Sequence, residues 1–138
     1  MPEYTFSFLN AVATDDLEEL LRALSADDIT PIRFDGSGVT DKDSFLARAD
    51  TDLPRPEDLH PHNWDALADT LWNGLATAEG TMLAIVWTDA HEMAHGDLQD
   101  FLVAVDVLIT AARSASVPVL LFLVGDGPGF RPLVPIED

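Results

Sequence analysis

The amino-acid sequence predicts an α/β fold in which a parallel sheet lies between helices. Two segments, 82–87 and 117–124, have the length of a strand and are apolar at nearly every position. Strands that are apolar on both faces are typical of parallel sheets covered by helices on both sides. Segments with helical periodicity separate the strands, and parallel connections are right-handed, so we expect a small, open three-layer arrangement.

The first 28 residues are expected to contribute one helix. Residues 4–9 alternate weakly between apolar and polar side chains and could form a short edge strand. Thr14 and Asp15 then precede leucines at helical spacing, with acidic residues in the early turns, which predicts a helix over about 15–25. The leucines that share one face of this helix are Leu17, Leu20, Leu21 and Leu24.

A strand, a helix and an irregular segment are expected next. Residues 29–34 have the composition of a strand and run into a glycine-containing turn. Thr40 is expected to cap a helix that ends near Ala49, with Asp43 at the capping-box position. Residues 50–61 contain three prolines and four acidic residues, which indicates an irregular connection.

Two further helices are predicted in the second half of the chain. The first runs from about 62–63 to Leu75, with Asn63 as its N-cap. The second is a long helix capped by Asp97 that ends near Ala115. The tail from residue 125 is rich in glycine and proline, and we expect it to be extended or mobile.

The charge of the chain excludes several classes of function. Seven Lys and Arg residues stand against 25 Asp and Glu residues, giving a formal net charge of -18. Such a surface repels phosphate groups, which argues against binding to nucleic acid or to an anionic membrane and leaves a basic protein partner as one interpretation. Composition alone favours the simpler interpretation, that the acidic residues keep the protein soluble or reflect a proteome with an acidic bias.

Other compositional features limit the chemistry and the location. The chain has no cysteine, which excludes disulfides, thiolate metal sites and cysteine nucleophiles. The beginning of the sequence lacks the basic and apolar regions of a secretory signal, and the longest apolar run, 117–124, is too short to cross a bilayer. We therefore expect a cytoplasmic protein, and we expect it to need no cofactor.

The predicted helix after residue 62 has two different faces. One face combines small residues and leucines and is suited to lie on a sheet; it is formed by Asn63, Ala66, Leu67, Thr70, Leu71 and Gly74. Asp65, Ala68, Asp69 and Trp72 lie on the opposite side, and Trp64 lies at the boundary. Aromatic side chains beside carboxylates are typical of a protein-binding site. The alternative is that both tryptophans pack against the protein while the acidic residues only solvate the helix.

The segment 63–71, Asn-Trp-Asp-Ala-Leu-x-Asp-x-Leu, resembles the signature helix of the barstar family, inhibitors of secreted bacterial ribonucleases. Residues 32–39 and 43–46 are similar to the first strand, turn and first helix of that family, and the order of the later elements also matches. The resemblance covers about residues 29–124. It implies a barstar-like domain with a three-stranded parallel sheet, preceded by an N-terminal extension with one helix (1–28) and followed by a tail (125–138).

The resemblance also implies a function. Family members place the acidic helix and the segment before it in the basic active-site cleft of the nuclease, where carboxylates occupy the positions of substrate phosphates. Asp69 aligns with the central inhibitory aspartate and Asp65 with the acid one turn earlier. The implied protein is a non-enzymatic inhibitor or immunity protein, expected to be a monomer, that binds a basic bacterial ribonuclease. The candidate partner-binding residues are Leu59, His60, His62, Asn63, Trp64, Asp65, Ala68, Asp69 and Trp72.

This chain departs from the family pattern at several positions. Ala68 stands where the motif usually has an aromatic residue between the two acids. Leu59 and His60 replace a pair of tyrosines, and Pro61 replaces a small turn residue. The acid that the last helix of the family contributes falls near Ala111. These changes indicate a different target nuclease, a different basic protein as partner, or a lost inhibitory role on the same fold.

A second motif suggests a different class of function. His91-Glu-Met-Ala-His95 matches the H-E-x-x-H pattern of zinc hydrolases, in which Glu92 would activate a zinc-bound water. That chemistry needs both histidines on one helix face and a third ligand, for which only Asp100 or Asp106 is at hand. Because residues 96 and 97 are expected to end the helix early, we favour a short polar helix without metal.

Overall fold

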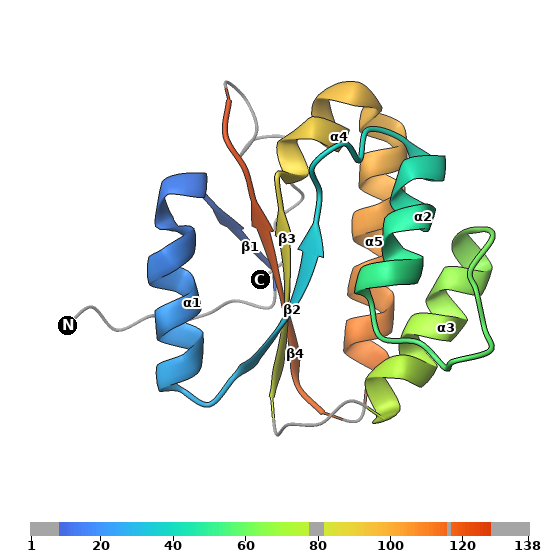
Figure 1. Cartoon of the computed structure of the whole chain (residues 1–138), viewed down its shortest axis with the longest axis horizontal. Helices are drawn as coiled ribbons and strands as arrows, with labels where there is room; N and C mark the ends of the chain where they lie inside the picture. The colour runs from blue at the N-terminus through green and yellow to red at the C-terminus, as the bar shows by residue number, and fades with distance from the viewer. Residues whose placement is uncertain (1–8, 78–81, 116, 128–138) are drawn as a thin grey trace.

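The four strands of the described chain form one parallel sheet in the order β1-β4-β3-β2 (Figure 1). The computed structural model describes residues 9–77, 82–115 and 117–127. The strands are β1 (Leu9–Val12), β2 (Thr30–Asp35), β3 (Leu83–Thr88) and β4 (Val119–Val124). The two central strands, β3 and β4, are the two apolar segments of the sequence, and both are almost entirely buried.

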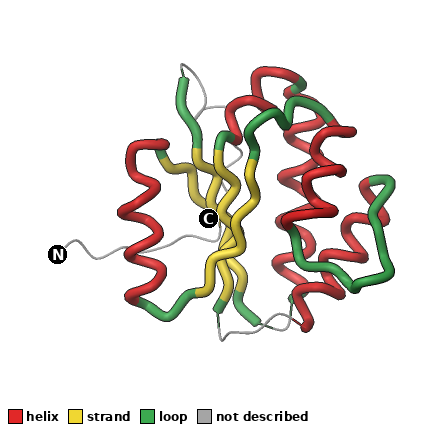
Figure 2. Tube along the Cα trace, viewed as in Figure 1, coloured by secondary structure: helices red, strands yellow, loops and turns green. Residues whose placement is uncertain are grey.

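Helices cover both faces of the sheet, which confirms the predicted three layers (Figure 2). One face is covered by α1 (Leu17–Ala26), which follows a short 3-10 turn, η1 (Thr14–Asp16). The other face is covered by α2 (Lys42–Asp52) and α5 (Leu98–Ser114), and α3 (Trp64–Thr77) packs on α5. A short helix, α4 (Ala90–Gly96), connects the end of β3 to α5. Within the described residues, no helix is both long and apolar enough to span a bilayer.

The core consists of one large and one small apolar cluster, separated by the sheet. The small cluster lies under α1 and includes Leu20, Leu24, Val86 and Phe122. The large cluster lies between the sheet and the other helices, and aromatic rings form its centre. The Phe45 ring lies 4.8 Å from that of Phe34 and 5.1 Å from that of Trp87, and the Trp87 ring lies 5.4 Å from that of Phe101.

The prediction of a three-stranded sheet was wrong, because β1 adds a fourth strand. This strand runs parallel to β4, from the Leu9–Leu121 pair to the Val12–Val124 pair. It begins where the predicted edge strand, 4–9, was expected to end, and residues 1–8 lie outside the described residues. A strand of four residues is too short to show a clear alternation of apolar and polar side chains in the sequence. Its pairing with β4 also depends on contacts between segments far apart in the chain.

The start of α2 also differs from the prediction. Asp41, and not Thr40, is the N-cap: its side chain accepts a hydrogen bond from the Ser44 backbone N–H (2.9 Å). The Ser44 hydroxyl lies 3.1 Å from the Asp41 backbone N–H and completes the capping box. Serine can take the usual place of Glu or Gln here because Asp41 and Ser44 are close enough for its short side chain. The helix also runs past Ala49 to Asp52.

Candidate protein-binding site

The candidate site is built on α3, whose first turn is fixed by a side-chain cap. The Asn63 Oδ1 atom accepts a hydrogen bond from the Ala66 backbone N–H at 2.8 Å, which confirms the predicted N-cap. Asp65 lies in the first turn, where the positive end of the helix dipole favours a carboxylate. The sequence therefore starts the helix at a defined residue and places the first acid there.

One face of α3 is buried and sets the direction of the opposite face. Leu67, Leu71 and Leu75 are each 1% exposed, and the hydroxyl of buried Thr70 donates to the Ala66 carbonyl (2.9 Å). The sequence predicted that this face lies on the sheet, but the helix packs chiefly on α5. The reason is that α2 and α5 already cover this side of the sheet (Figure 1).

The two carboxylates of α3 point away from the core. Asp65 and Asp69 are both exposed. Within the described part of the chain, neither carboxylate forms an ion pair with Lys, Arg or His. Two like charges one helical turn apart destabilise a helix slightly. Their presence on a helix held by a buried leucine face makes α3 a fixed acidic surface.

The two tryptophans of α3 both contact the rest of the protein and are both partly exposed to solvent. Trp64 is half-buried, and its ring centroid lies 5.6 Å from that of Phe45 in the core. Trp72 is 46% exposed, and its indole N–H donates to the carbonyl of Ser114, the last residue of α5 (2.9 Å). Ala68 is half-buried. Both tryptophans therefore help to fix α3, and Trp72 also presents a large part of its ring to the solvent beside the acids.

The connector, residues 53–63 between α2 and α3, carries the remaining predicted residues. Leu59 is 46% exposed, and His62, three residues later, is also exposed. His60 turns toward α2, where its Nδ1 atom lies 2.7 Å from Asp50 Oδ1. Pro61 is buried. The structure therefore places all nine predicted residues on one helix and the segment that leads into it.

Sequence reasoning missed Arg55, which contacts both α2 and the connector. Its guanidinium forms an ion pair with Asp50 (Nε to Oδ1, 3.1 Å) and also donates to backbone carbonyls of the connector. One signal could have found it: Arg55 is the only Lys or Arg between Arg48 and Arg113. A lone basic residue within an acidic segment is expected to have a specific internal partner.

A family model described as Barstar (barnase inhibitor) matches residues 29–124, the range over which the sequence resembles that family. The chain belongs to the Barstar (barnase inhibitor) family. Membership implies a barnase-type ribonuclease inhibitor, and members of the family are inhibitors rather than enzymes. No curated protein and no solved structure matches the chain.

The H-E-x-x-H segment has a structural role in this barstar-family chain. The Glu92 Oε1 atom accepts a hydrogen bond from the Gly38 backbone N–H (3.1 Å), and the His91 Nδ1 atom accepts one from the Asp126 backbone N–H (3.1 Å). These two contacts join α4 to the loops that follow β2 and β4. The His91 and His95 rings lie 6.3 Å apart, on the seven-residue helix α4.

A different trio, Asp89, His91 and Glu92, brings its potential ligand atoms within 4.8 Å of one another. A metal on His91 Nδ1 would displace the Asp126 N–H. A metal on the other ring nitrogen would need a proton on Nδ1, which then could not accept that hydrogen bond. Asp100, one of the predicted third ligands, accepts a hydrogen bond from the Lys42 backbone N–H (3.1 Å). The donors of this region therefore fit loop anchoring better than metal binding.

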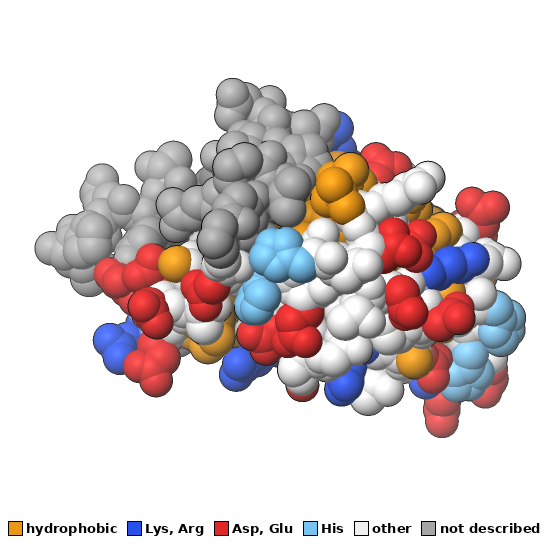
Figure 3. All heavy atoms as spheres, turned by 90° about the horizontal axis from the view of Figure 1, so that it is seen from above, with side chains coloured by type: hydrophobic (Ala, Val, Ile, Leu, Met, Phe, Trp, Pro, Cys, Tyr) orange, Lys and Arg blue, Asp and Glu red, His pale blue; other side chains and the backbone are white. Residues whose placement is uncertain are grey.

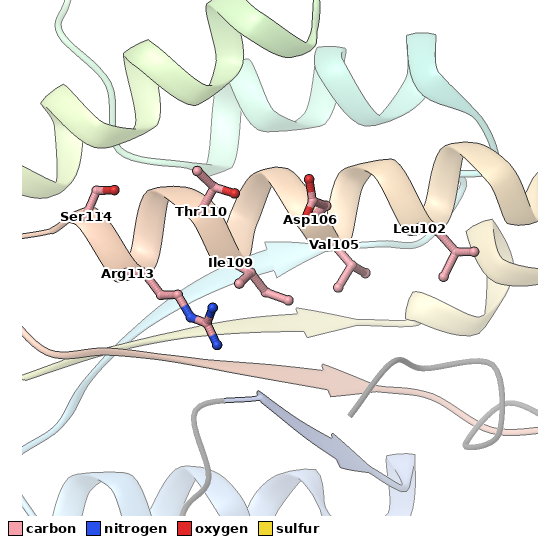
Figure 4. A pocket seen from close by; sticks show the side chains of 7 residues that line it. All are labelled: Leu102, Val105, Asp106, Ile109, Thr110, Arg113 and Ser114. Carbon is pink, nitrogen blue, oxygen red and sulfur yellow. The ribbon is translucent and has the colours of Figure 1, made fainter. Parts of the chain in front are cut away.

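A hollow lies along α5 in this barstar-family chain (Figure 4). It is lined by Leu102, Val105, Asp106, Ile109, Thr110, Arg113 and Ser114. Its charged residues, Asp106 and Arg113, have opposite signs, so the hollow lacks the uniform charge of the α3 surface. The nearby position of the missing family acid, Ala111, is only 3% exposed and is part of the core.

Acidic side chains are also present on the side of the molecule seen from above in Figure 1. Figure 3 shows separate groups of Asp and Glu side chains over the described surface in this view, between areas of other atoms, with His, Lys and Arg at scattered positions. A cationic partner would therefore be attracted to a wide area of this chain, and the geometry of α3 would have to select the place of contact.

Proposed function

We propose that this chain inhibits a basic, barnase-type ribonuclease by inserting α3 and the connector into the active-site cleft of the enzyme. In this proposal Asp69 and Asp65 occupy positions that substrate phosphates would take. The observation that carries the proposal is the pair of exposed carboxylates, which form no ion pair with any described residue, on a helix whose opposite face is buried. Family membership over residues 29–124 supports the same assignment.

The physical basis of the proposed inhibition is fixed charge. A carboxylate held on a packed helix needs little reorganisation to meet a cationic side chain, so the complex loses less conformational entropy than one made by a mobile loop. The net charge of -18 would steer a cationic enzyme toward the chain and accelerate association. We propose that this inhibition takes place in the cytoplasm, as the sequence predicts.

The proposed target differs from the usual partner in the shape of its cleft. Ala68 provides no aromatic surface between the two acids, whereas Trp72 presents an exposed ring on the same side of the helix one turn later. Leu59 and His60 stand where the family has tyrosines, and Leu59 is half-exposed in the connector. We infer a ribonuclease that accepts an apolar side chain at the connector and an indole ring near the second acid.

The test is inhibition of RNA cleavage by a panel of purified barnase-type ribonucleases, titrated with this chain at two salt concentrations. Stoichiometric inhibition that weakens with salt would support the proposal. Inhibition of no panel member would contradict it and would direct the search to another basic protein as partner.

The position of the site is tested by Asp69→Asn against a matched control, Asp16→Asn. Both substitutions keep the shape of the side chain and remove one negative charge, and Asp16 makes no side-chain capping bond at the start of α1. We expect Asp69→Asn to weaken binding by at least ~30-fold, or about 2 kcal/mol, because a partner cation would be left unpaired. The control should change affinity less than about twofold. Equal effects would mean that the charge acts diffusely and that α3 is not the site.

A further inference from the structure

We propose that Arg55 is a positioning residue that holds the connector in the conformation in which it meets the partner. This inference rests on the proposed function, because it assigns a role to the segment next to the inhibitory helix. Arg55 itself is not expected to touch the ribonuclease. Its side chain in the ion pair with Asp50 is only 23% exposed.

The contacts of Arg55 tie the connector to the end of α2. Its Nε atom donates to the Asp50 carbonyl at 2.9 Å and lies 3.1 Å from Asp50 Oδ1. One terminal nitrogen, Nη1, lies within hydrogen-bond distance of three carbonyls of the connector: Pro56 (3.1 Å), Glu57 (2.9 Å) and Leu59 (3.2 Å). Nε and Nη1 carry three N–H groups between them, so some of these N–H groups are shared by two acceptors. The planar guanidinium holds both nitrogens in fixed positions, whereas the single ammonium group of lysine cannot occupy both.

Two further contacts fix the same segment. The backbone of Pro54 lies directly against α3 at Gly74, where an added Cβ atom would come within 2.0 Å of the Pro54 carbonyl oxygen. His60 lies against Asp50, with its Nδ1 atom 2.7 Å from the Oδ1 atom. The connector is thus held at its beginning by α3 and along its length by Arg55 and Asp50. The side chains that remain exposed on it include Glu57, Asp58 and Leu59.

The same contacts remove a positive charge from the proposed binding surface. Arg55 is the only Lys or Arg from residue 49 to residue 112. An arginine exposed on this segment would repel a cationic partner. Because its guanidinium is directed at carbonyls of its own chain and at the Asp50 carboxylate, the acidic residues of the connector and α3 dominate the surface.

The experiment compares Arg55→Lys with the matched control Arg22→Lys. Both variants keep the net charge, and the Arg22 side chain is 79% exposed on α1, where it pairs with Glu18 four residues earlier. Hydrogen exchange of the connector amides is measured in the free protein. Association and dissociation rates are measured with a purified barnase-type ribonuclease that the wild-type chain inhibits, and melting temperatures report global stability.

For Arg55→Lys we expect connector amides to exchange about tenfold faster or more, while amides of α1 and β3 are unchanged. We expect dissociation to be roughly five- to tenfold faster and association to be unchanged within about twofold, since the net charge is the same and a loosened segment must be ordered on binding. The Arg22→Lys control should leave exchange in the connector and both rates unaltered.

Three outcomes would contradict the inference. Unchanged exchange would show that Arg55 does not hold the connector, whatever the partner. Faster exchange with unchanged dissociation would show that the connector is held but takes no part in binding. Faster exchange in every element, with a large drop in melting temperature, would show that Arg55 only supports the fold. If the wild-type chain inhibits no ribonuclease, the proposed function fails, and the exchange measurements alone still decide whether Arg55 holds the connector.

Discussion

At the scale of single residues, the direction of Asp69 is set by its immediate neighbours. Thr70 and Leu71 follow it directly and are buried, and Leu67 precedes it by two positions. Successive residues of a helix are rotated by about 100°. Burial of these neighbours therefore turns Asp69 outward, and Asp65 shares that direction because it lies one turn earlier.

Asp41 shows how one carboxylate can carry a structural role at this scale. It accepts hydrogen bonds from the Ser44 backbone N–H (2.9 Å) and from the Ser44 hydroxyl (2.7 Å). These hydrogen bonds hold the pKa of the Asp41 carboxyl below its ordinary value, because they favour the ionised form. Hydrogen bonds from Ser37 lower the pKa of Asp35 in the same way, and those from Thr14 lower the pKa of Asp126.

The lowered pKa of Asp41 predicts a loss of stability in acid. A carboxyl whose pKa is lower in the folded state stabilises the fold above its unfolded pKa, and that contribution is lost as the pH falls through the folded pKa. We expect the free energy of unfolding to decrease as the pH is lowered from about 5 to 2, and to decrease less steeply in Asp41→Asn. Urea unfolding at several pH values measures this. Asp43→Asn, at an exposed acid in the first turn of the same helix, is the control, and identical slopes for the two variants would contradict the assignment.

At the scale of elements, β1 joins the N-terminal extension to the family fold. Its four residues pair with β4, and Val12 also accepts a hydrogen bond from the Gly125 backbone N–H (3.0 Å). Leu9 is 3% exposed and belongs to the large core cluster. The family match begins only at residue 29, yet β1 and α1 lie on the same sheet as the matched part.

This packing predicts that β1 contributes to stability. We expect Leu9→Ala to reduce the free energy of unfolding by about 2–4 kcal/mol, because it removes a buried side chain and leaves a cavity. Leu102→Ala is the matched control, since Leu102 is 39% exposed on α5, and it should cost well under about 1 kcal/mol. Denaturant unfolding measures both. A Leu9 variant as stable as the control would mean that the extension is dispensable for the fold.

At the scale of the whole molecule, the net charge of -18 would act mainly on the rate at which a cationic partner associates. The field of many like charges acts over about a Debye length and attracts a cationic protein before contact is made. Steering of this kind raises the association rate and leaves the dissociation rate to the short-range contacts of the interface.

The charge therefore predicts a specific salt dependence for the proposed complex. We expect the association rate with a barnase-type ribonuclease to fall by roughly 10- to 100-fold between about 50 and 500 mM salt, because screening removes the steering. The dissociation rate should change by less than about threefold. Stopped-flow mixing measures the first rate and competition with excess inhibitor the second. An association rate independent of salt would contradict a role for the net charge.

Features that depend on local patterns could be predicted from the amino-acid sequence alone. The apolar runs at 82–87 and 117–124 marked the two central strands, because burial on both faces leaves no polar position in a strand. Helical spacing and the Asn63 cap located α3 and placed its two acids on one face. The motif of nine residues identified the family, and with it the inhibitor function that membership implies.

Features that depend on contacts between distant segments could be seen only in the folded chain. The pairing of β1 with β4, the packing of α3 on α5 and the bonds of Arg55 to the connector have no periodic signature in the sequence. The hydrogen bond from the Trp72 indole to the Ser114 carbonyl also joins residues far apart in the sequence and has no such signature. Hydrophobic periodicity and capping report the environment of a residue within its own helix or strand, whereas pairing partners and side-chain hydrogen bonds are chosen only when the elements pack together.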